Sequence, residues 1–289
     1  MKKILVPTDF SPNTKSGIRF AIQWAAQQNL ELVFIHVLNI MIPTRWPEGT
    51  VAKYIAGEKK ACGKRFSKFI DTVYKSMNIK PGLYSTVLKH EYNPAKTVLE
   101  YCRKDKTIDC ICISTNGAGS VMKLFGTNTS ELIAKSPIPV LAIPKNYKPK
   151  EVKRILYATD FRNYKEELAK VIRFASALCA KVDVVHFAWP GELQFEEEAL
   201  EKLSRDYEYG LNVDIEECDP SVSLNERLQK TILKRKPSVV IMFSNKERNL
   251  MQKLFLSSKA KELSFSLKAP LLVYCKVMAP IKTKKHELA

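Results

Sequence analysis

The chain has 289 residues, of which 45% are hydrophobic, and a formal net charge of +17. This length favours two domains of about 100–200 residues each, and the hydrophobic fraction is sufficient for a core in both. The opening MKKILVPTDF contains too short an apolar run for a signal peptide, and no run approaches the roughly 18 apolar residues of a membrane span. We therefore expect a cytoplasmic protein without a membrane partner.

Positive charge is concentrated in the first half of the chain. Residues 1–150 carry +13 of the net charge and residues 151–289 carry +4. A basic half attracts the phosphate groups of nucleic acids, nucleotides or membranes. The lysines are spread along helical segments such as VAKYIAGEKKACGKRFSKF, however, and the sequence contains no RNA-binding or zinc-finger signature. We interpret the charge as a solvated surface, which makes nucleic acid the less favoured partner.

In chain order, the first half alternates strand and helix patterns. Short apolar runs predict buried strands, and apolar residues at helical spacing predict amphipathic helices. The expected strands of this half are 2–7, 31–38, 82–88, 108–114 and 138–144. The expected helices are one capped by Ser11, with Pro12 in its first turn, and then 51–77, 94–104 and 129–136.

The second half of the chain repeats the first. KKILVPTDFSPN, from Lys2, recurs as KRILYATDFRNY, from Lys153, and the halves end alike in SPIPVLAIPK and LKAPLLVYCK. The strands of the second half are expected near 153–158, 181–187, 211–217, 238–243 and 270–275. We therefore divide the chain into a first domain, 1–146, a second domain, 151–277, and a basic tail, 278–289.

The alternation of strands and helices predicts an α/β protein. Each half is expected to form a Rossmann-like sandwich, with a five-stranded parallel sheet in the order 3-2-1-4-5 between helices. The final strand of each half is apolar and would lie at a sheet edge, which is a hazard unless the edge is paired. We expect Val140–Ile143 and Leu271–Tyr274 to pair across a pseudo-twofold axis, so that one chain forms an intramolecular pseudo-dimer. A homodimer of whole chains stays open.

The ends of strands 1 and 4 are the place where a ligand is expected. In such sheets ligands bind beyond the carboxyl ends of the strands, where the strand order reverses. Strand 1 leads into Pro7-Thr8-Asp9, and strand 4 ends at Ser114, where the stretch STNGAGSVMKLFGTNT begins. Three glycines fall within this stretch, and a helix start follows it. Glycine allows backbone N–H groups to approach an anion closely, and the helix start adds a positive dipole.

Phosphate binding and a tight turn with positive φ are the two interpretations of these glycines. The spacings of the P-loop and of the Rossmann fingerprint are both absent. In the second half, Lys246 and Leu256 stand at the places of Gly117 and Gly126, although the pattern of strand, loop and helix is kept. The turn itself therefore does not require glycine, which favours phosphate binding, and favours it in the first domain only.

The sequences ILVPTDFS, FIHVL and STNGAGSVMKLFGTNTSELIAKSPIPVLAIP resemble the universal stress protein family, and the duplication resembles its tandem-domain members. ATP-binding members of that family carry G-x2-G-x9-G-[ST] after strand 4. The resemblance implies a nucleotide site formed by Pro7, Thr8, Asp9, Val37, Ile113, Ser114, Gly117, Gly126, Thr127 and Asn128. Two departures are visible: Ser114 stands at the first glycine, and eight residues separate Gly117 from Gly126.

Within that resemblance, the first three site residues and Val37 would surround the adenine, and the others the sugar and phosphates. No nucleophile–base pair and no metal-binding spacing can be read in the sequence. His36 and His186 occupy equivalent places in the second strand of each half, which indicates a shared packing or hydrogen-bonding role. We therefore expect no catalytic or metal-ligating residues.

The overall expectation is a non-enzymatic stress-response sensor or regulatory module. It would bind ATP or AMP in the first domain, with magnesium held through phosphate oxygens and Asp9, and act on an unidentified protein partner. A ligand-free interaction scaffold and a slow ATPase of the related adenine-nucleotide α-hydrolase superfamily are the alternatives.

Overall fold

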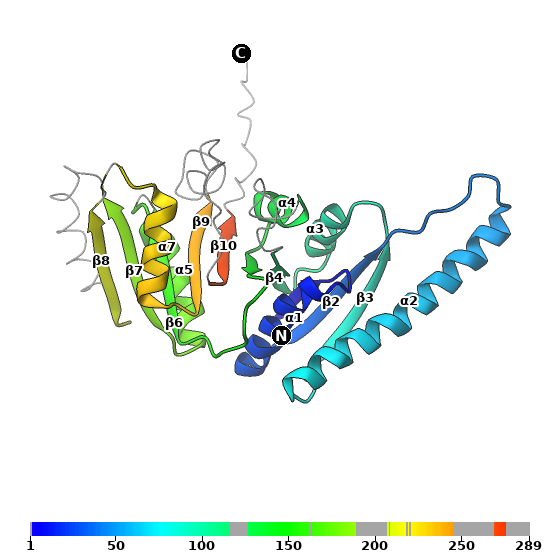
Figure 1. Ribbon diagram of the computed structural model, residues 1–289, viewed down its shortest axis with the longest axis horizontal. Helices are drawn as coiled ribbons and strands as arrows, with labels where there is room; N and C mark the ends of the chain where they lie inside the picture. Colours follow the sequence, from blue (N-terminus) through cyan, green and yellow to red (C-terminus); the bar gives the residue numbers. More distant parts are fainter. Residues whose placement is uncertain are drawn as a thin grey trace, which may run out of the picture.

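The computed structural model describes residues 2–115, 127–161, 163–188, 207, 209–217, 219, 221–244 and 269–275. These residues form one ten-stranded sheet with helices on both faces (Figure 1). The first half contains β1 (Lys3–Pro7), the 3-10 helix η1 (Pro12–Thr14), α1 (Lys15–Gln28), β2 (Glu31–Leu38), α2 (Glu48–Met77), β3 (Tyr84–His90), α3 (Pro94–Lys104), β4 (Ile108–Ser114), α4 (Thr127–Lys135) and β5 (Val140–Ile143). The second half contains β6 (Arg154–Thr159), α5 (Tyr164–Ala177), β7 (Lys181–Ala188), β8 (Leu211–Glu217), α7 (Leu224–Arg235), β9 (Val239–Ser244) and β10 (Leu271–Cys275).

The strand order is the one that the sequence predicts, present twice. The sheet runs β3-β2-β1-β4-β5-β10-β9-β6-β7-β8, so each half has the order 3-2-1-4-5. Neighbouring strands within each half are parallel. Strands β5 and β10 are antiparallel, with Leu141 opposite Leu272. The predicted pairing of the two final strands is therefore confirmed, and the two halves pack as a pseudo-dimer around it.

Helices cover the sheet in two layers that continue across both halves. Helices α1, α2 and α5 pack on one face, and α3, α4 and α7 pack on the other. Successive residues of the central strands contribute to opposite cores: Leu141 and Leu272 belong to the first, and Val140 and Val273 to the second. This alternation follows from the period of two in a strand and explains why both central strands are apolar throughout.

Helices α1 and α5 also contact each other across the centre of the molecule. The rings of Trp24 and Phe174 lie 5.4 Å apart at 65°. The Gln28 side-chain amide donates to the backbone oxygen of Ala177, and the Gln27 side-chain oxygen accepts from the Val152 backbone N–H at 3.2 Å. Side chains and backbone therefore join the halves in addition to the β5–β10 ladder.

Several element limits differ from the expectations: the strand expected at 82–88 is Tyr84–His90, the helix expected from residue 129 begins at Thr127, and the starts of two earlier helices differ as well. Ser11 makes no side-chain capping bond, and the chain enters α1 through the 3-10 turn η1. Helix α2 begins at Glu48, three residues before the predicted start. Residues 144–153 connect β5 to β6, but the domain limits 1–146 and 151–277 stay predictions, and the basic tail 278–289 lies outside the described residues. Among the described helices, none has the length and apolar character needed to span a bilayer.

Truncating Leu272 tests the importance of the β5–β10 junction. This side chain is 1% exposed at the centre of the sheet. We expect Leu272→Ala to lower the free energy of unfolding by about 2–5 kcal/mol, because it leaves a cavity in the shared core. Leu233→Ala is the control, since Leu233 is 58% exposed on α7, and it should change the stability by less than about 0.5 kcal/mol. Urea denaturation of both variants measures the difference, and equal effects would contradict the described packing.

Candidate functional site

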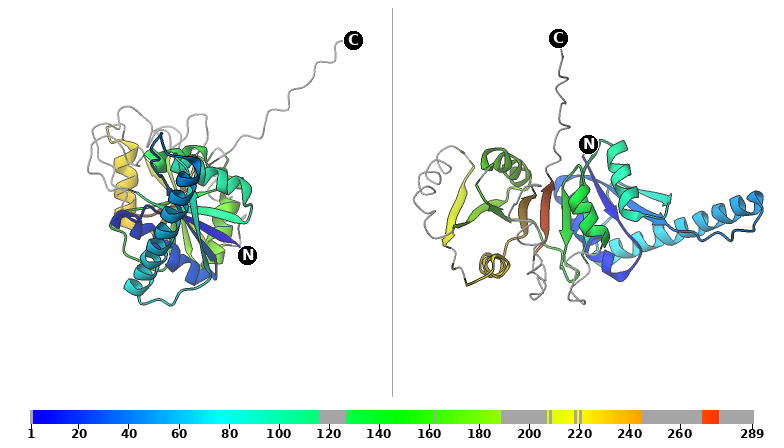
Figure 2. Two further views of the ribbon diagram at one scale, coloured as in Figure 1. Left: turned by 90° about the vertical axis from the view of Figure 1, so that its right-hand side faces the viewer. Right: turned by 90° about the horizontal axis from the view of Figure 1, so that it is seen from above.

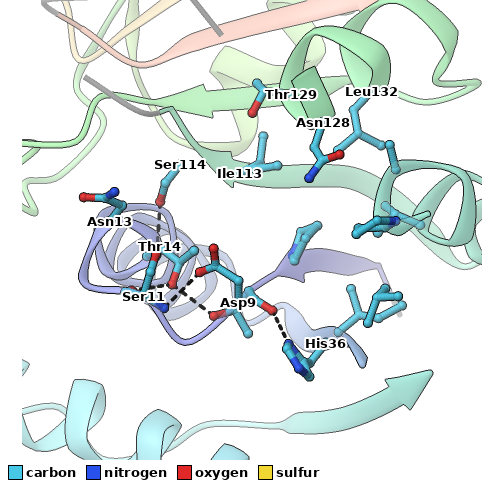
Figure 3. A pocket seen from close by; sticks show the side chains of 17 residues that line it. Asp9, Ser11, Asn13, Thr14, His36, Ile113, Ser114, Asn128, Thr129 and Leu132 are labelled. Carbon is cyan, nitrogen blue, oxygen red and sulfur yellow. Dashed lines mark hydrogen bonds between the residues drawn. The ribbon is translucent and has the colours of Figure 1, made fainter. Parts of the chain in front are cut away.

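A cavity of about 210 Å³ lies at the carboxyl ends of β1 and β4 (Figure 3). Its walls come from the ends of β1, β2 and β4, the segment 9–14, and the first turns of α3 and α4. The strand order of the first half reverses at this point. After β1 the chain continues to β2 and β3 on one side of β1, and it then crosses to β4 on the other side of β1. The position agrees with the place where open α/β sheets bind ligands.

Most of the predicted site residues converge on this cavity. Seven of them line it: Pro7, Thr8, Asp9, Val37, Ile113, Ser114 and Asn128. Thr127 begins α4, but its side chain is not described, and Gly117 and Gly126 lie outside the described residues. The sequence therefore identified both strand ends that form the cavity, whereas its prediction about the glycines concerns a segment that the structure does not describe.

The cavity also has walls that the sequence reasoning missed. They are Ser11, Asn13, Thr14, Ile35, His36, Pro94, Ala95, Val98, Thr129 and Leu132. The apolar members come largely from the starts of α3 and α4, which pack over the carboxyl ends of the strands. A signal was present in the sequence, since Asn93-Pro94 is a typical helix start, and the Asn93 side chain does accept from the Lys96 backbone N–H at 3.0 Å.

The segment after β1 is a tight turn held by its own side chains. The Thr8 hydroxyl oxygen accepts from the Phe10 backbone N–H at 3.1 Å and lies 3.0 Å from the Thr14 hydroxyl. One carboxylate oxygen of Asp9 accepts from the Ser11 backbone N–H at 2.9 Å. Phe10 has a φ of 63°, which is uncommon for a residue with a side chain. The buried Thr8 hydroxyl therefore stabilises this turn, while the Asp9 side chain is exposed at the cavity.

His36 holds the same turn from β2. Its Nδ1 lies 2.7 Å from the Thr8 carbonyl oxygen, and because a carbonyl can only accept, Nδ1 carries the proton. The Phe10 ring stacks on the imidazole with 4.2 Å between centroids and 25° between planes. Burial lowers the pKa of His36 below its usual value of 6.5, and the Thr8 carbonyl opposes this effect in part. The neutral imidazole is thus the form that fits the fold.

The second half repeats these contacts. The Thr159 hydroxyl accepts from the Phe161 backbone N–H at 3.0 Å, and His186 Nδ1 lies 2.9 Å from the Thr159 carbonyl oxygen. Phe161 has a φ of 57°, and its ring lies 4.8 Å from that of His186. The predicted shared hydrogen-bonding role of the two histidines is confirmed. Much of the repeated sequence motif therefore encodes a turn, whether or not a ligand binds beside it.

Ser114 connects the end of β4 to the start of α1. Its hydroxyl oxygen accepts from the Gly17 backbone N–H at 2.7 Å and from the Ser16 hydroxyl at 3.0 Å, and it donates to the Thr14 carbonyl at 3.0 Å. A Cβ on Gly17 would lie 2.7 Å from the Ser114 hydroxyl and 2.8 Å from its backbone nitrogen. Gly17 is therefore needed for the close approach of helix and strand, a role that the sequence reasoning did not identify.

Larger groups occupy the corresponding place in the second half. The strand register makes Phe243 of β9 the counterpart of Ser114 of β4. Equivalent residues of β1 and β6 pair with β4 and β9, and Ser114 and Phe243 each lie three residues after the paired residue. The Phe243 ring stacks on Tyr274 at 4.8 Å and 11°, and it meets the Tyr157 ring at 5.8 Å. The Tyr157 hydroxyl in turn donates to the buried Glu167 carboxylate at 2.7 Å. Aromatic packing thus fills the place of the small residues of the first half.

The charge of the cavity wall is limited to one side chain. Among the described lining residues, Asp9 is the only one with a formal charge, and no lysine or arginine is present. The remaining wall combines apolar side chains with hydroxyl and amide groups. Within the same described part of the chain, no group of three or more His, Cys, Asp or Glu residues is arranged to hold a metal ion. Such a wall suits a neutral organic group with hydrogen-bonding edges.

Comparisons with known proteins identify a matching sequence family and similar solved structures. Residues 1–144 match the sequence model of the Universal stress protein family. No curated protein sequence matches the chain. A universal stress protein from Archaeoglobus fulgidus has a similar structure, with a TM-score of 0.67 and 15% identity over 95% of this chain and 98% of that one. A functionally unknown protein from Pseudomonas aeruginosa has a TM-score of 0.59 and 15% identity over 95% of this chain and 92% of that one.

The parallel sheet, covered on both faces and with a cavity at the carboxyl ends of its strands, defines an α/β protein of the Rossmann-like class. The chain belongs to the universal stress protein family: its first half matches the family model, and its second half repeats the same strand order. The structural likenesses, which extend over nearly the whole chain, agree with this arrangement at the level of the fold.

Adding a methyl group at Gly17 tests the contact between α1 and β4. In an open helix position, glycine to alanine normally increases stability by about 0.5–1 kcal/mol. At Gly17 the new Cβ meets backbone and hydroxyl atoms, so we expect Gly17→Ala to decrease stability by about 1–3 kcal/mol. Gly57→Ala on α2 is the matched control and should show the normal increase, because nothing lies within 4 Å of its Cβ position. Thermal unfolding distinguishes the two signs, and an increase in both variants would refute the close approach.

The pKa of His36 offers a second test, in the turn itself. Since burial lowers this pKa, the unfolded chain binds more protons than the folded chain below pH 6.5. The stabilisation by neutral His36 is therefore complete above pH 6.5 and is lost as the pH falls through the lower, folded value. An NMR titration of the imidazole should give a pKa below 6.5. A value at or above 6.5 would show that the ring is not buried against Thr8 and Phe10 as described.

Proposed function

We propose that this protein binds an adenine nucleotide, ATP or AMP, in the cavity of its first half, and acts as a non-enzymatic sensor or regulatory module of a stress response. The single observation that carries this proposal is the cavity between the ends of β1 and β4, lined by seven of the ten residues that the sequence indicated. Membership of the universal stress protein family supports the same assignment.

The described wall suits the nucleoside part of the ligand. A volume of about 210 Å³ is below the roughly 300–1,000 Å³ of sites that enclose a drug-sized molecule, so the base and sugar would occupy most of it. Val98, Ile113 and Leu132 provide apolar contact for a purine, and hydroxyl and amide groups provide hydrogen bonds. The phosphates would extend toward the start of α4, where Asn128 and Thr129 line the cavity. A helix start favours an anion.

In the proposed site, the Asp9 carboxylate would interact with a hydrated cation or with sugar hydroxyl groups. One of its carboxylate oxygens already accepts the Ser11 backbone N–H, which fixes the orientation of the group. The carboxylate could accept from hydroxyl groups, or from water molecules bound to magnesium on the phosphates, because Mg²⁺ usually keeps several of its waters. Direct contact between Asp9 and a phosphate would be repulsive.

The second half is proposed to bind no nucleotide. Phe243 replaces Ser114 there and is packed between two tyrosine rings, and Ala158 stands in place of Pro7. Lys246 and Leu256 replace the glycines in the sequence. The second half would then serve as the fixed structural partner of the first.

Isothermal titration calorimetry with ATP, AMP and adenosine tests the proposal. We expect one molecule bound per chain. Asp9→Asn should weaken binding by roughly tenfold, because it removes the charge and keeps the oxygen that accepts from Ser11. Asp160→Asn is the matched control at the equivalent position of the second half and should leave binding unchanged.

Gly126→Leu extends the test to the glycine-rich segment. It should remove ATP and AMP binding while the weaker binding of adenosine, which has no phosphate, persists. Two sites per chain, equal effects of the Asp9 and Asp160 substitutions, or unchanged ATP binding in Gly126→Leu would contradict the proposal. A turnover of ATP near the ~10 s⁻¹ typical of enzymes would overturn the non-enzymatic role.

A further inference from the structure

Helix α2 projects from the body of the protein. Its second half is attached to the sheet through Cys62, Phe66, Ile70 and Val73, all of which are buried. None of the residues 48–61 is buried. Figure 1 and the right-hand view of Figure 2 show the first half of the helix extending well past the sheet. More than a third of this 30-residue helix is therefore free of the body and accessible along its length.

Five of the six lysines of α2 form a row on the side away from the body, and the sixth, Lys59, lies on another side of the helix. The row consists of Lys53, Lys60, Lys64, Lys68 and Lys75, and all five are exposed. With 3.6 residues per turn, these positions fall within about 80° of one another around the helix, opposite the buried residues, and extend over about 33 Å. Five lysines that look scattered in the sequence are thus collected on one face by the helical geometry.

This row is not neutralised by nearby carboxylates. Helices α3 and α4 each carry an ion pair at i,i+4, Lys96 with Glu100 and Glu131 with Lys135. Within the described residues, no ion pair involves a side chain of α2. Only Asp71 adds a negative charge on the same face. The row is therefore uninterrupted from Lys53 to Lys68, and Asp71 lies between its last two members, Lys68 and Lys75.

Two aromatic side chains stand at the free end of the row. Trp46 is 40% exposed and Tyr54 is 38% exposed, and their rings meet edge to face with 5.2 Å between centroids. Tyr54 directly follows Lys53, the first lysine of the row. Exposed aromatic rings beside a line of cations are the elements with which proteins bind single-stranded nucleic acids: cations contact the phosphates, and rings stack on the bases.

We infer that the outer face of α2 binds single-stranded nucleic acid, with the lysine row along the phosphates and Trp46 and Tyr54 against the bases. A duplex is a poorer match, because its stacked bases offer no faces to these rings. An anionic membrane is also a poorer match. The apolar residues of the projecting part, Val51 and Ile55, lie on the opposite side of the helix from the lysine row, so that inserting them would direct the row away from the lipid headgroups.

Fluorescence anisotropy with labelled oligouridylate and oligothymidylate of about 20 nucleotides tests this inference. For contacts with four or five phosphates, the logarithm of affinity should fall against the logarithm of salt concentration with a slope of about −3. The triple variant Lys60→Gln, Lys64→Gln, Lys68→Gln should reduce the magnitude of this slope by about 2, since each lysine contributes about 0.7. Trp46→Ala should weaken binding roughly tenfold and leave the slope unchanged.

The control removes the same charge elsewhere. Lys145→Gln, Lys148→Gln, Lys150→Gln changes three exposed lysines of the connection between the halves and should leave affinity and slope as in the unaltered protein. Equal losses in both triple variants would mean that only net charge matters, and would overturn the inference. So would Trp46→Ala without effect, tighter binding of a duplex of the same length, or binding of phosphatidylserine vesicles without binding of either oligomer. Circular dichroism checks that the variants have the same secondary-structure content as the unaltered protein before their binding is compared.

Discussion

The antiparallel pairing of β5 with β10 is the contact on which the rest of the structure depends. It turns two five-stranded sheets into one sheet of ten strands and removes two apolar edges from solvent. Because the pairing is antiparallel while each half is parallel within itself, the strands of the two halves run in opposite directions. Their carboxyl ends therefore lie at opposite ends of the sheet along the strand direction. The two potential ligand sites are thus separated, and the second half could lose its site while it continued to support the first.

The same few residues in each half make a turn that positions the site. A threonine hydroxyl and carbonyl, a phenylalanine with positive φ and a histidine from the neighbouring strand repeat their contacts in both halves. This common frame exists beside a cavity in the first half and beside packed aromatic rings in the second. The difference between the halves therefore comes from what surrounds the turn, above all Gly17 and Ser114 in one half and Phe243 in the other.

The sequence was sufficient for the fold and for part of the site. Continuous apolar strands, the internal repeat and the apolar final strands predicted the strand order and the central pairing, because these depend on burial and periodicity. The strand ends Pro7 to Asp9 and Ile113 to Ser114 followed from topology. Gly17 could not be found in this way, since its importance arises from contact with a strand almost a hundred residues away. The lysine row of α2 could be read from the predicted helix 51–77, but the projection of the helix from the body could not, because it depends on where the sheet ends.

The central claim is that one chain carries one nucleotide, held between β1 and β4. A crystal structure of the protein grown with ATP tests it most directly, because it reports both the number and the place of the bound molecules. The account predicts electron density for an adenine and a ribose beside Pro7, Val37 and Ile113, with phosphates toward the start of α4, and no such density beside Thr159 and Phe243. Density in the second half alone, or in both halves, would contradict it, as would a first-half cavity left empty at saturating ATP.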